Sequence, residues 1–145
     1  MNFLFKKICI ASDHAGYKLK EQIKNHLINK YVSIFDLGPY ENESVDYPDY
    51  AKKLAKRIKD QKSDIGILVC GSGTGMAISA NKTKGIRAAV CYNTLSTRLS
   101  RQHNNANIMA LGARLTKKSL SLKLVELFLK TKFDGGRHLK RVKKI

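Results

Sequence analysis

Short apolar runs alternate along the whole chain with longer segments whose apolar residues recur every three or four positions. The clearest run is residues 65–70, which no charged residue interrupts and which ends at a glycine-rich stretch. A continuous apolar run of this kind is typical of a central parallel strand that is covered on both faces. Other strands are predicted at residues 7–11, 31–37, 86–92 and 107–111.

The intervals between these runs are predicted to be helical. Leu19, Ile23 and Leu27 follow one another at intervals of four residues, which places them on one face of a helix over residues 16–30. Asp49 is a suitable N-cap for the next helix. The remaining segments are a polar loop at 38–48, helices at 49–61, 75–81, 94–102 and 116–130, and a basic, partly helical tail at about 133–145.

This alternation predicts an α/β fold, a Rossmann-like three-layer sandwich with a five-stranded, mostly parallel sheet. We expect the strand order 2-1-3-4-5, in which the chain reverses direction between strands one and three and a ligand binds at their carboxyl ends. A chain of 145 residues without repeats or linkers fits a single domain over residues 1–145.

The formal net charge of +17 raises the possibility of a nucleic-acid partner, because phosphate backbones attract Lys and Arg. However, 21 of the 28 basic residues are lysines scattered over predicted helix faces, and no nucleic-acid-binding signature is present. We therefore expect no specific nucleic acid, although the charge should attract a small anion. The longest uncharged stretch, 65–81, is interrupted by glycines, and no signal peptide is evident. These features predict a cytoplasmic protein without a membrane partner.

The cysteines are Cys9, Cys70 and Cys91, and no CxxC pair is present. An odd number without such a pair argues against a disulfide scaffold or a zinc site. We find no cluster with metal-ligand spacing along the sequence, and predict neither metal nor cofactor. Cys9 and Cys91 are interpreted as small core residues.

Cys70 is different because it ends the apolar run and is followed by Gly71, Ser72, Gly73, Thr74 and Gly75. Glycines at every second position let several backbone N–H groups point into one concavity, and such a nest beside a helix start favours an anion. A thiolate facing these dipoles can act as nucleophile or general base. The alternatives are a merely tight turn and a buried cysteine, since the loop matches neither a Walker motif nor a dinucleotide fingerprint.

Two other polar segments carry imidazoles. Asp13 and His14 follow the first strand and suit proton transfer or phosphate contact, although Asp13 is also a candidate helix cap. His103 lies in a polar run that ends a helix, a position that is equally common on a solvated surface. His26, in the middle of a helix, is expected to be exposed.

The chain contains only seven arginines. Arg114 follows the last strand, and Arg137 and Arg141 are spaced i, i+4 and so share one helical face. Guanidinium groups bind phosphate oxygens in a bidentate manner. A solvated basic tail is the competing interpretation of Arg137 and Arg141.

Together these segments resemble the type B ribose-5-phosphate isomerases and their relatives, the galactose-6-phosphate isomerase subunits. The resemblance covers nearly the whole chain, and it is carried by ASDHAG (11–16), DYPDYA (46–51), ILVCGSGTG (67–75), SANK (79–82), GIRAAVC (85–91), SRQHNNANI (100–108), LGAR (111–114) and GGRHLKR (135–141).

The resemblance implies a role for each candidate. Cys70 would be the base that moves a proton between C1 and C2 of the sugar phosphate, and residues 71–75 would hold the enediolate, with Ser72 among them. His103 would open the sugar ring beside Asn104. The substrate would be bound by Asp13 and His14, and its phosphate by Arg114, Arg137 and Arg141.

The resemblance also implies a homodimer or dimer of dimers with active sites shared between subunits. One branch of the family uses a glutamate after the glycine loop as its base, but Met76 occupies that position here, so the cysteine branch fits. Ribose 5-phosphate is the expected substrate. A six-carbon sugar phosphate, or a non-catalytic basic binding module, remains an alternative.

Overall fold

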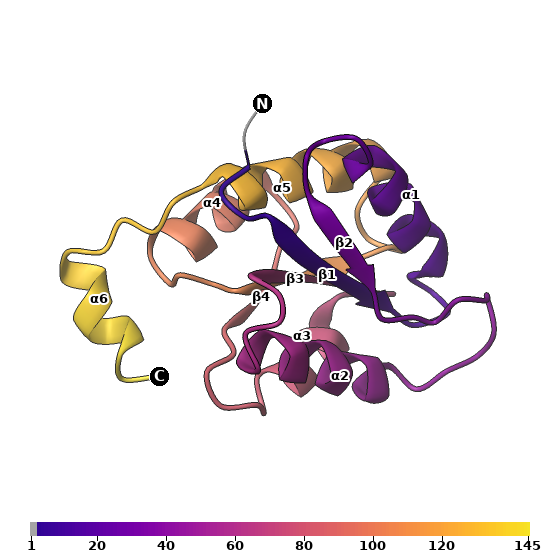
Figure 1. The fold of residues 1–145 in the computed structure, drawn as a ribbon, viewed down its shortest axis with the longest axis horizontal. Helices are drawn as coiled ribbons and strands as arrows, with labels where there is room; N and C mark the ends of the chain where they lie inside the picture. The colour runs from indigo at the N-terminus through magenta and orange to yellow at the C-terminus, as the bar shows by residue number, and fades with distance from the viewer. Residues whose placement is uncertain (1–2) are drawn as a thin grey trace.

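The computed structural model describes residues 3–145 as a parallel sheet between two layers of helices (Figure 1). The α/β sandwich predicted from the sequence is therefore confirmed. Along the chain the elements are β1 (Lys7–Ser12), α1 (Tyr17–Leu27), β2 (Ser33–Asp36), α2 (Tyr47–Lys59), β3 (Ile65–Cys70), α3 (Thr74–Ala80), β4 (Ala88–Val90), α4 (Thr94–Gln102), β5 (Ile108–Gly112), α5 (Lys118–Lys130) and α6 (Arg137–Val142).

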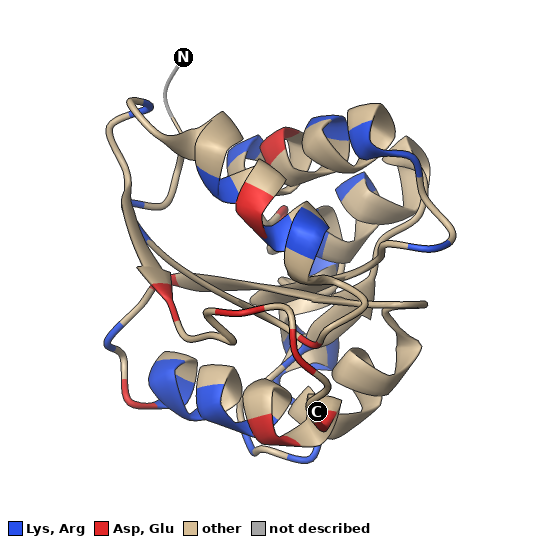
Figure 2. Cartoon of the chain, turned by 90° about the vertical axis from the view of Figure 1, so that its right-hand side faces the viewer, with Lys and Arg blue, Asp and Glu red and all other residues tan. Residues whose placement is uncertain are grey.

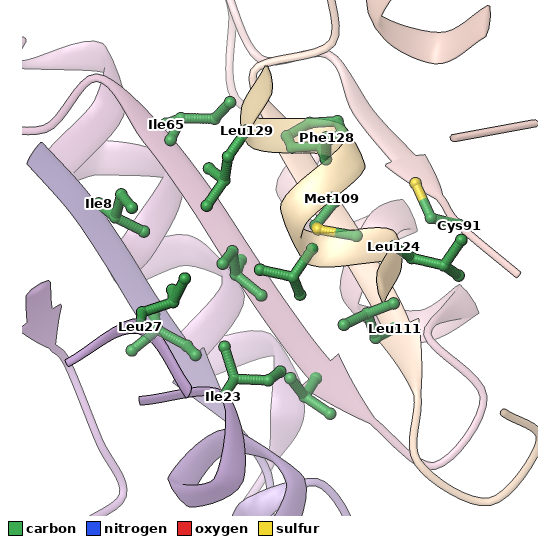
Figure 3. Packing of buried hydrophobic residues seen from close by; sticks show 14 of the residues in the cluster. Ile8, Ile23, Leu27, Ile65, Cys91, Met109, Leu111, Leu124, Phe128 and Leu129 are labelled. Carbon is green, nitrogen blue, oxygen red and sulfur yellow. The ribbon is translucent and has the colours of Figure 1, made fainter. Parts of the chain in front are cut away.

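Two hydrophobic clusters, one on each face of the sheet, hold the layers together. On one face, α1 and α5 pack against β1, β3 and β5, and Figure 3 shows Ile23, Leu27 and Phe128 lying over the strands. On the other face, α2 and α3 cover the same strands with a second buried cluster. No helix within residues 3–145 is long and apolar enough to cross a membrane.

β3 is the central strand, and every one of its residues is buried. It pairs in parallel with β1 on one side and with β5 on the other, in a register that sets Ile67 opposite Ile10 and Met109. Its bounds are those predicted from the apolar run at residues 65–70. The end of this strand therefore lies at the middle of the sheet edge.

The expected strand order 2-1-3-4-5 is wrong at one side of the sheet, where the observed order is β2-β1-β3-β5-β4. β5 is wholly buried and lies inside the sheet, whereas the short β4 is only partly buried and lies at the edge. A fully apolar strand needs a neighbour on each side and helices on both faces, so β5 takes the inner place. The chain reversal between β1 and β3 is as predicted.

The helix that precedes β3 begins earlier than expected. α2 starts at Tyr47 after the extended residue Asp46, with a proline in its first turn, so Asp49 lies inside the helix and is not its N-cap. Proline is favoured there because its fixed φ suits a helix and its missing N–H costs no hydrogen bond. The tail is partly helical, as expected, since α6 is short and buries no residue.

A carboxylate on α5 links the two helices that cover one face of the sheet. Glu126 contacts His26 (2.9 Å) and Lys30 (3.0 Å) from the α1 side, and Lys130 (2.9 Å) on its own helix. Hydrogen bonds from Lys130 and Lys30 lower the pKa of Glu126 to about 2, although partial burial opposes the shift. His26 is therefore partly buried and paired, and the expectation that it is simply exposed is wrong.

This linkage predicts a pH-dependent contribution to stability. The folded-state pKa of Glu126 lies below its ordinary value of 4.5, so the carboxylate stabilises the fold above that pH and the contribution is lost as the pH falls towards 2. Glu126→Gln should lower the thermal midpoint at pH 7 and flatten its decline between these pH values. Asp60→Asn, in the exposed pair with Lys56, is the control and should change little. An unchanged acid profile in Glu126→Gln would contradict the assignment.

Candidate active site

A pocket of about 430 Å³ opens at the carboxyl ends of β1, β3 and β5, next to the predicted chain reversal. The segments after these three strands supply most of its wall, because parallel strands all end at one edge of the sheet. Its lining residues are Asp13, Tyr47, Cys70, Gly71, Ser72, Gly75, Arg114 and Leu115.

Cys70 lies in the wall of this pocket with only 4% of its surface exposed. Its Sγ accepts a hydrogen bond from the backbone N–H of Gly73, at 3.1 Å. Gly73 has φ +82, in the left-handed region that favours glycine, and it is the residue that turns the chain into α3. The N–H dipole of Gly73 thus points at the sulfur.

The glycine loop brings further donors to the same place. Gly75 and Met76 lie in the first turn of α3, where backbone N–H groups have no carbonyl acceptor within the helix. The N–H of Thr74 donates to Oγ of Ser72, at 3.3 Å. A Cβ on Gly75 would lie 2.8 Å from the ring of Tyr47, so glycine is needed for this aromatic side chain to close the pocket wall.

Asp13 and His14 lie after β1, on the same edge of the sheet. Oδ1 of the buried Asp13 accepts a hydrogen bond from the N–H of Gly16 (2.9 Å), while Gly16 itself is the N-cap of α1. His14 is exposed, and its Nδ1 accepts a hydrogen bond from the N–H of Val45, at 3.3 Å. In the neutral ring the proton then resides on Nε2, which is left as a donor towards solvent or a ligand.

Arg114 adds a positive charge to the pocket. Its backbone N–H donates to the carbonyl of Gly71 (3.0 Å), and its guanidinium packs over Gly71, where a Cβ would lie 3.2 Å from Nη1. No carboxylate within residues 3–145 forms an ion pair with it. The guanidinium is thus available to an anion that enters the pocket.

The other predicted site residues lie elsewhere in the chain. His103 and Asn104 follow α4, and Arg137 and Arg141 lie on α6, which stands away from the sheet beyond α4 (Figure 1). The turn after α4 leads to Asn107, whose carbonyl accepts from Gly66 near the start of β3. Cys70 lies at the other end of that strand, so it is separated from the turn after α4 by about 13 Å along the sheet. One chain therefore does not bring all the predicted residues together.

The tail brings an additional imidazole to His103. The His138 ring stacks on the His103 ring, with centroids 4.2 Å apart and planes inclined by 13°. Desolvation and the positive charges of His103, Arg137 and Arg141 lower the pKa of His138. His138 was missed in the sequence analysis, although it is part of the GGRHLKR motif, because that motif was interpreted only through its arginines.

The fold brings together one group of possible metal ligands that the spacing along the sequence did not indicate. His103, Asp134 and His138 each present a ligand atom, and these atoms lie within 4.8 Å of one another. Spacing along the sequence could not show this cluster, because the tail returns to the end of α4 and contributes two of the three side chains.

Charge is distributed unevenly over the molecule. Figure 2 shows basic positions concentrated on the helices, whereas acidic positions occur largely in the loops at the edge of the sheet that faces the viewer. Many Lys and Arg residues therefore lie on helices, as predicted, although Lys20 and Arg101 are buried. Within the pocket itself, Arg114 is the basic residue among the lining side chains.

Comparisons with known proteins agree with this arrangement. The sequence model of the Ribose/Galactose Isomerase family matches residues 8–145. Ribose-5-phosphate isomerase B of Escherichia coli is 43% identical over 140 residues, which is 97% of this chain and 94% of that protein.

Solved structures are equally similar. The structure of ribose-5-phosphate isomerase B from Clostridium thermocellum superposes with a TM-score of 0.94 at 50% identity, covering 95% of this chain and 93% of that one. The enzyme from Mycoplasma genitalium, solved with bound ribulose-5-phosphate, gives a TM-score of 0.90 at 44% identity, with 94% and 91% covered.

The three cysteines should differ in reactivity. Burial raises the pKa of Cys9 to about 12 and that of Cys91 to about 11, so neither forms a thiolate near neutral pH. Cys70 lies at a pocket and accepts an N–H hydrogen bond. Iodoacetamide at neutral pH should therefore alkylate Cys70 first in the folded protein, as measured by peptide mass spectrometry. Faster modification of Cys91 than of Cys70 would contradict this order.

Proposed function

Because the chain belongs to the ribose/galactose isomerase family, we propose that it interconverts ribose 5-phosphate and ribulose 5-phosphate. The observation that carries the proposal is the hydrogen bond from the Gly73 N–H to Sγ of Cys70 in the wall of an open pocket. This hydrogen bond places a candidate thiolate base beside backbone N–H donors that can stabilise a negatively charged oxygen. The bound ribulose-5-phosphate in the Mycoplasma genitalium relative supports this choice of substrate.

The reaction requires a base and a set of oxyanion donors. In the open-chain aldose, Cys70 removes the proton from C2, and the electrons move into the C1 carbonyl to give an enediolate. The proton of the C2 hydroxyl passes to the C1 oxygen, and Cys70 returns its proton to C1 as the C2 carbonyl forms. The N–H groups of the loop at 71–75 stabilise the developing negative oxygen, with the Ser72 hydroxyl beside them. Groups of the chain itself can thus supply both functions.

Met76 supports the assignment of the base. It is fully buried in the first turn of α3, and its thioether cannot accept a proton. A carboxylate at this position is the alternative base within the family, and Met76 removes that possibility. Cys9 and Cys91 are buried and do not line the pocket of Cys70, so they are not candidates.

The remaining candidates bind and open the sugar in our proposal. Ribose 5-phosphate is mostly cyclic in water, and His103, beside Asn104, would exchange protons with the ring oxygen and the anomeric hydroxyl. Asp13 and His14 would hold the sugar hydroxyls. The phosphate would be bound by Arg114, Arg137 and Arg141, whose planar guanidinium groups match its oxygens.

We propose that a second copy of the chain completes each site, in a homodimer or a dimer of dimers. His103, Arg137 and Arg141 lie at the opposite sheet edge from Cys70, so one chain does not provide both halves. Figure 1 supports this view, because α6 extends away from its own sheet. The tail also carries the exposed apolar residues Leu139 and Ile145, which a second copy would cover.

The chain would act in the cytoplasm, in the non-oxidative branch of the pentose phosphate pathway. A six-carbon sugar phosphate is the alternative substrate, because the exposed loop before α2 reaches His14 through Val45 and could set the length of sugar that fits. Assays of the purified chain should give the highest kcat/KM with ribose 5-phosphate. A higher kcat/KM with allose 6-phosphate or galactose 6-phosphate would identify that sugar phosphate as the substrate instead.

Loss of the base should affect turnover more than binding. Cys70→Ala should lower kcat by about 10²- to 10⁴-fold and leave KM nearly unchanged, because a general base acts mainly in the transition state. Cys91→Ala, which removes a buried cysteine away from the pocket, is the matched control and should keep its kcat. Full activity in Cys70→Ala would show that the Cys70 thiolate is not the catalytic base.

Shared sites predict complementation between inactive variants. Cys70→Ala and His103→Asn chains that are mixed and reassembled should regain activity, because one of the two sites in each mixed dimer has no substitution. Random mixing should restore roughly a quarter of wild-type turnover. Arg137→Ala should complement Cys70→Ala in the same way, whereas Cys70→Ala and Asp13→Ala, on one side of the site, should not. Activity that never rises on mixing would contradict the sharing of sites.

A further inference from the structure

Two imidazoles and a carboxylate converge where the tail returns to the end of α4. The possible ligand atoms of His103, Asp134 and His138 lie within 4.8 Å of one another. Within residues 3–145 this is the one group of three or more His, Cys, Asp or Glu side chains with such a separation. It lies outside the Cys70 pocket, whose lining includes none of the three residues.

The backbone fixes the positions of all three side chains. The N–H of His103 donates to the carbonyl of Leu99 at 2.8 Å, and the N–H of Asp134 donates to that of Gln102 at 3.0 Å. The N–H of His138 donates to the carbonyl of Gly135, at 3.0 Å. The tail is thereby attached to α4 at the point where the ligands meet.

The side chains themselves remain available. No ion pair within residues 3–145 involves Asp134, in contrast to the carboxylate of Glu126, which contacts the ring of His26 at 2.9 Å. His103 and His138 are partly exposed and stack on each other. An ion can therefore reach this cluster without unfolding of the chain.

We propose that His103, Asp134 and His138 form a binding site for a divalent transition-metal ion such as Zn²⁺. Two imidazoles and one carboxylate suit Zn²⁺, Co²⁺ or Cu²⁺, whereas Mg²⁺ and Ca²⁺ prefer oxygen ligands alone. Three protein ligands leave the fourth tetrahedral position for water or an anion.

The side chains must move closer together to bind the ion. In a tetrahedral site with ligand bonds of about 2.0–2.1 Å, two ligand atoms lie about 3.4 Å apart. The separation of up to 4.8 Å must therefore shrink by as much as about 1.4 Å. Rotation of the two partly exposed rings out of their parallel stack supplies this movement and also turns each ring plane towards the ion.

Neighbouring charges limit the affinity. Arg137 and Arg141 act electrostatically on His138 and oppose a second positive charge, while Asp134 favours it. We expect weaker binding than at a structural zinc site of four protein ligands. The same arginines favour an anion as the fourth ligand.

Occupation of His103 by the ion would block the ring-opening role proposed above. The ion would therefore inhibit the enzyme reversibly, and only this consequence rests on the proposed function.

The test measures binding and does not depend on catalysis. Full-length protein is titrated with Zn²⁺ by calorimetry and with Co²⁺ by visible absorption, alongside His138→Ala and Asp134→Asn. Neither substitution should unfold the chain, because α6 buries no residue and Asp134 is exposed. The matched control is His26→Ala, which removes another partly exposed histidine next to a carboxylate. Cys70→Ser tests for capture of the metal by the thiol instead.

The expected result is one ion bound per chain, with affinity lowered at least about tenfold in both His138→Ala and Asp134→Asn, since even the loss of an outer-shell partner has effects of this size. His26→Ala should bind as the wild type does. The proposal is overturned if either tail variant keeps wild-type affinity, or if binding is lost in Cys70→Ser while His138→Ala retains it.

Discussion

The parallel alignment of all five strands determines where every candidate group of this molecule can lie. Each strand ends at one edge of the sheet, and each helix that follows a strand runs back and ends at the other edge. Asp13, Cys70 and Arg114 follow strand ends and so share one edge. His103 follows the end of α4 and therefore lies at the opposite edge. The same constraint that builds the Cys70 pocket separates it from His103, the proposed ring-opening residue.

A buried charge outside the pocket holds the start of the loop that leads to the pocket residue Tyr47. Lys20 is fully buried, and its ammonium donates to Asp36 (2.8 Å) and to the carbonyl of Pro39 (2.5 Å). Burial opposes the charged form of Asp36, but the hydrogen bonds from Lys20 and Lys24 outweigh it and lower its pKa. A buried ammonium without such partners would be strongly unfavourable. This network therefore fixes the start of the loop that leads to Tyr47.

The sequence predicted the features that arise from local pattern. The bounds of β3, the position of Cys70 before the glycine loop and the pocket at the chain reversal all follow from an apolar run, glycine spacing and strand–helix alternation. The order of β4 and β5 could not be obtained in this way. It depends on which of the two strands is stabilised more by having a neighbouring strand on each side. The stack of His138 on His103 arises where a tail folds back, and no periodicity encodes that contact. Tyr47 was missed as a pocket residue because the start of α2 was placed two residues too late.

The proposed sugar-phosphate site and the proposed metal site both use His103, next to the tail. α6 is much shorter than the ~12 residues at which an isolated helix becomes even marginally stable, and it buries nothing in its own chain. Its order thus depends on Asp134, on the imidazole stack and, in our proposal, on a second copy. A sugar phosphate needs the lone pair of His103 for proton transfer, whereas a metal ion would occupy it. Because Arg137 and Arg141 attract anions and repel cations, the field around His103 favours the phosphate. Metal binding should then prevail only where the anionic substrate is scarce, or where an anion enters as the fourth ligand and neutralises part of the added charge.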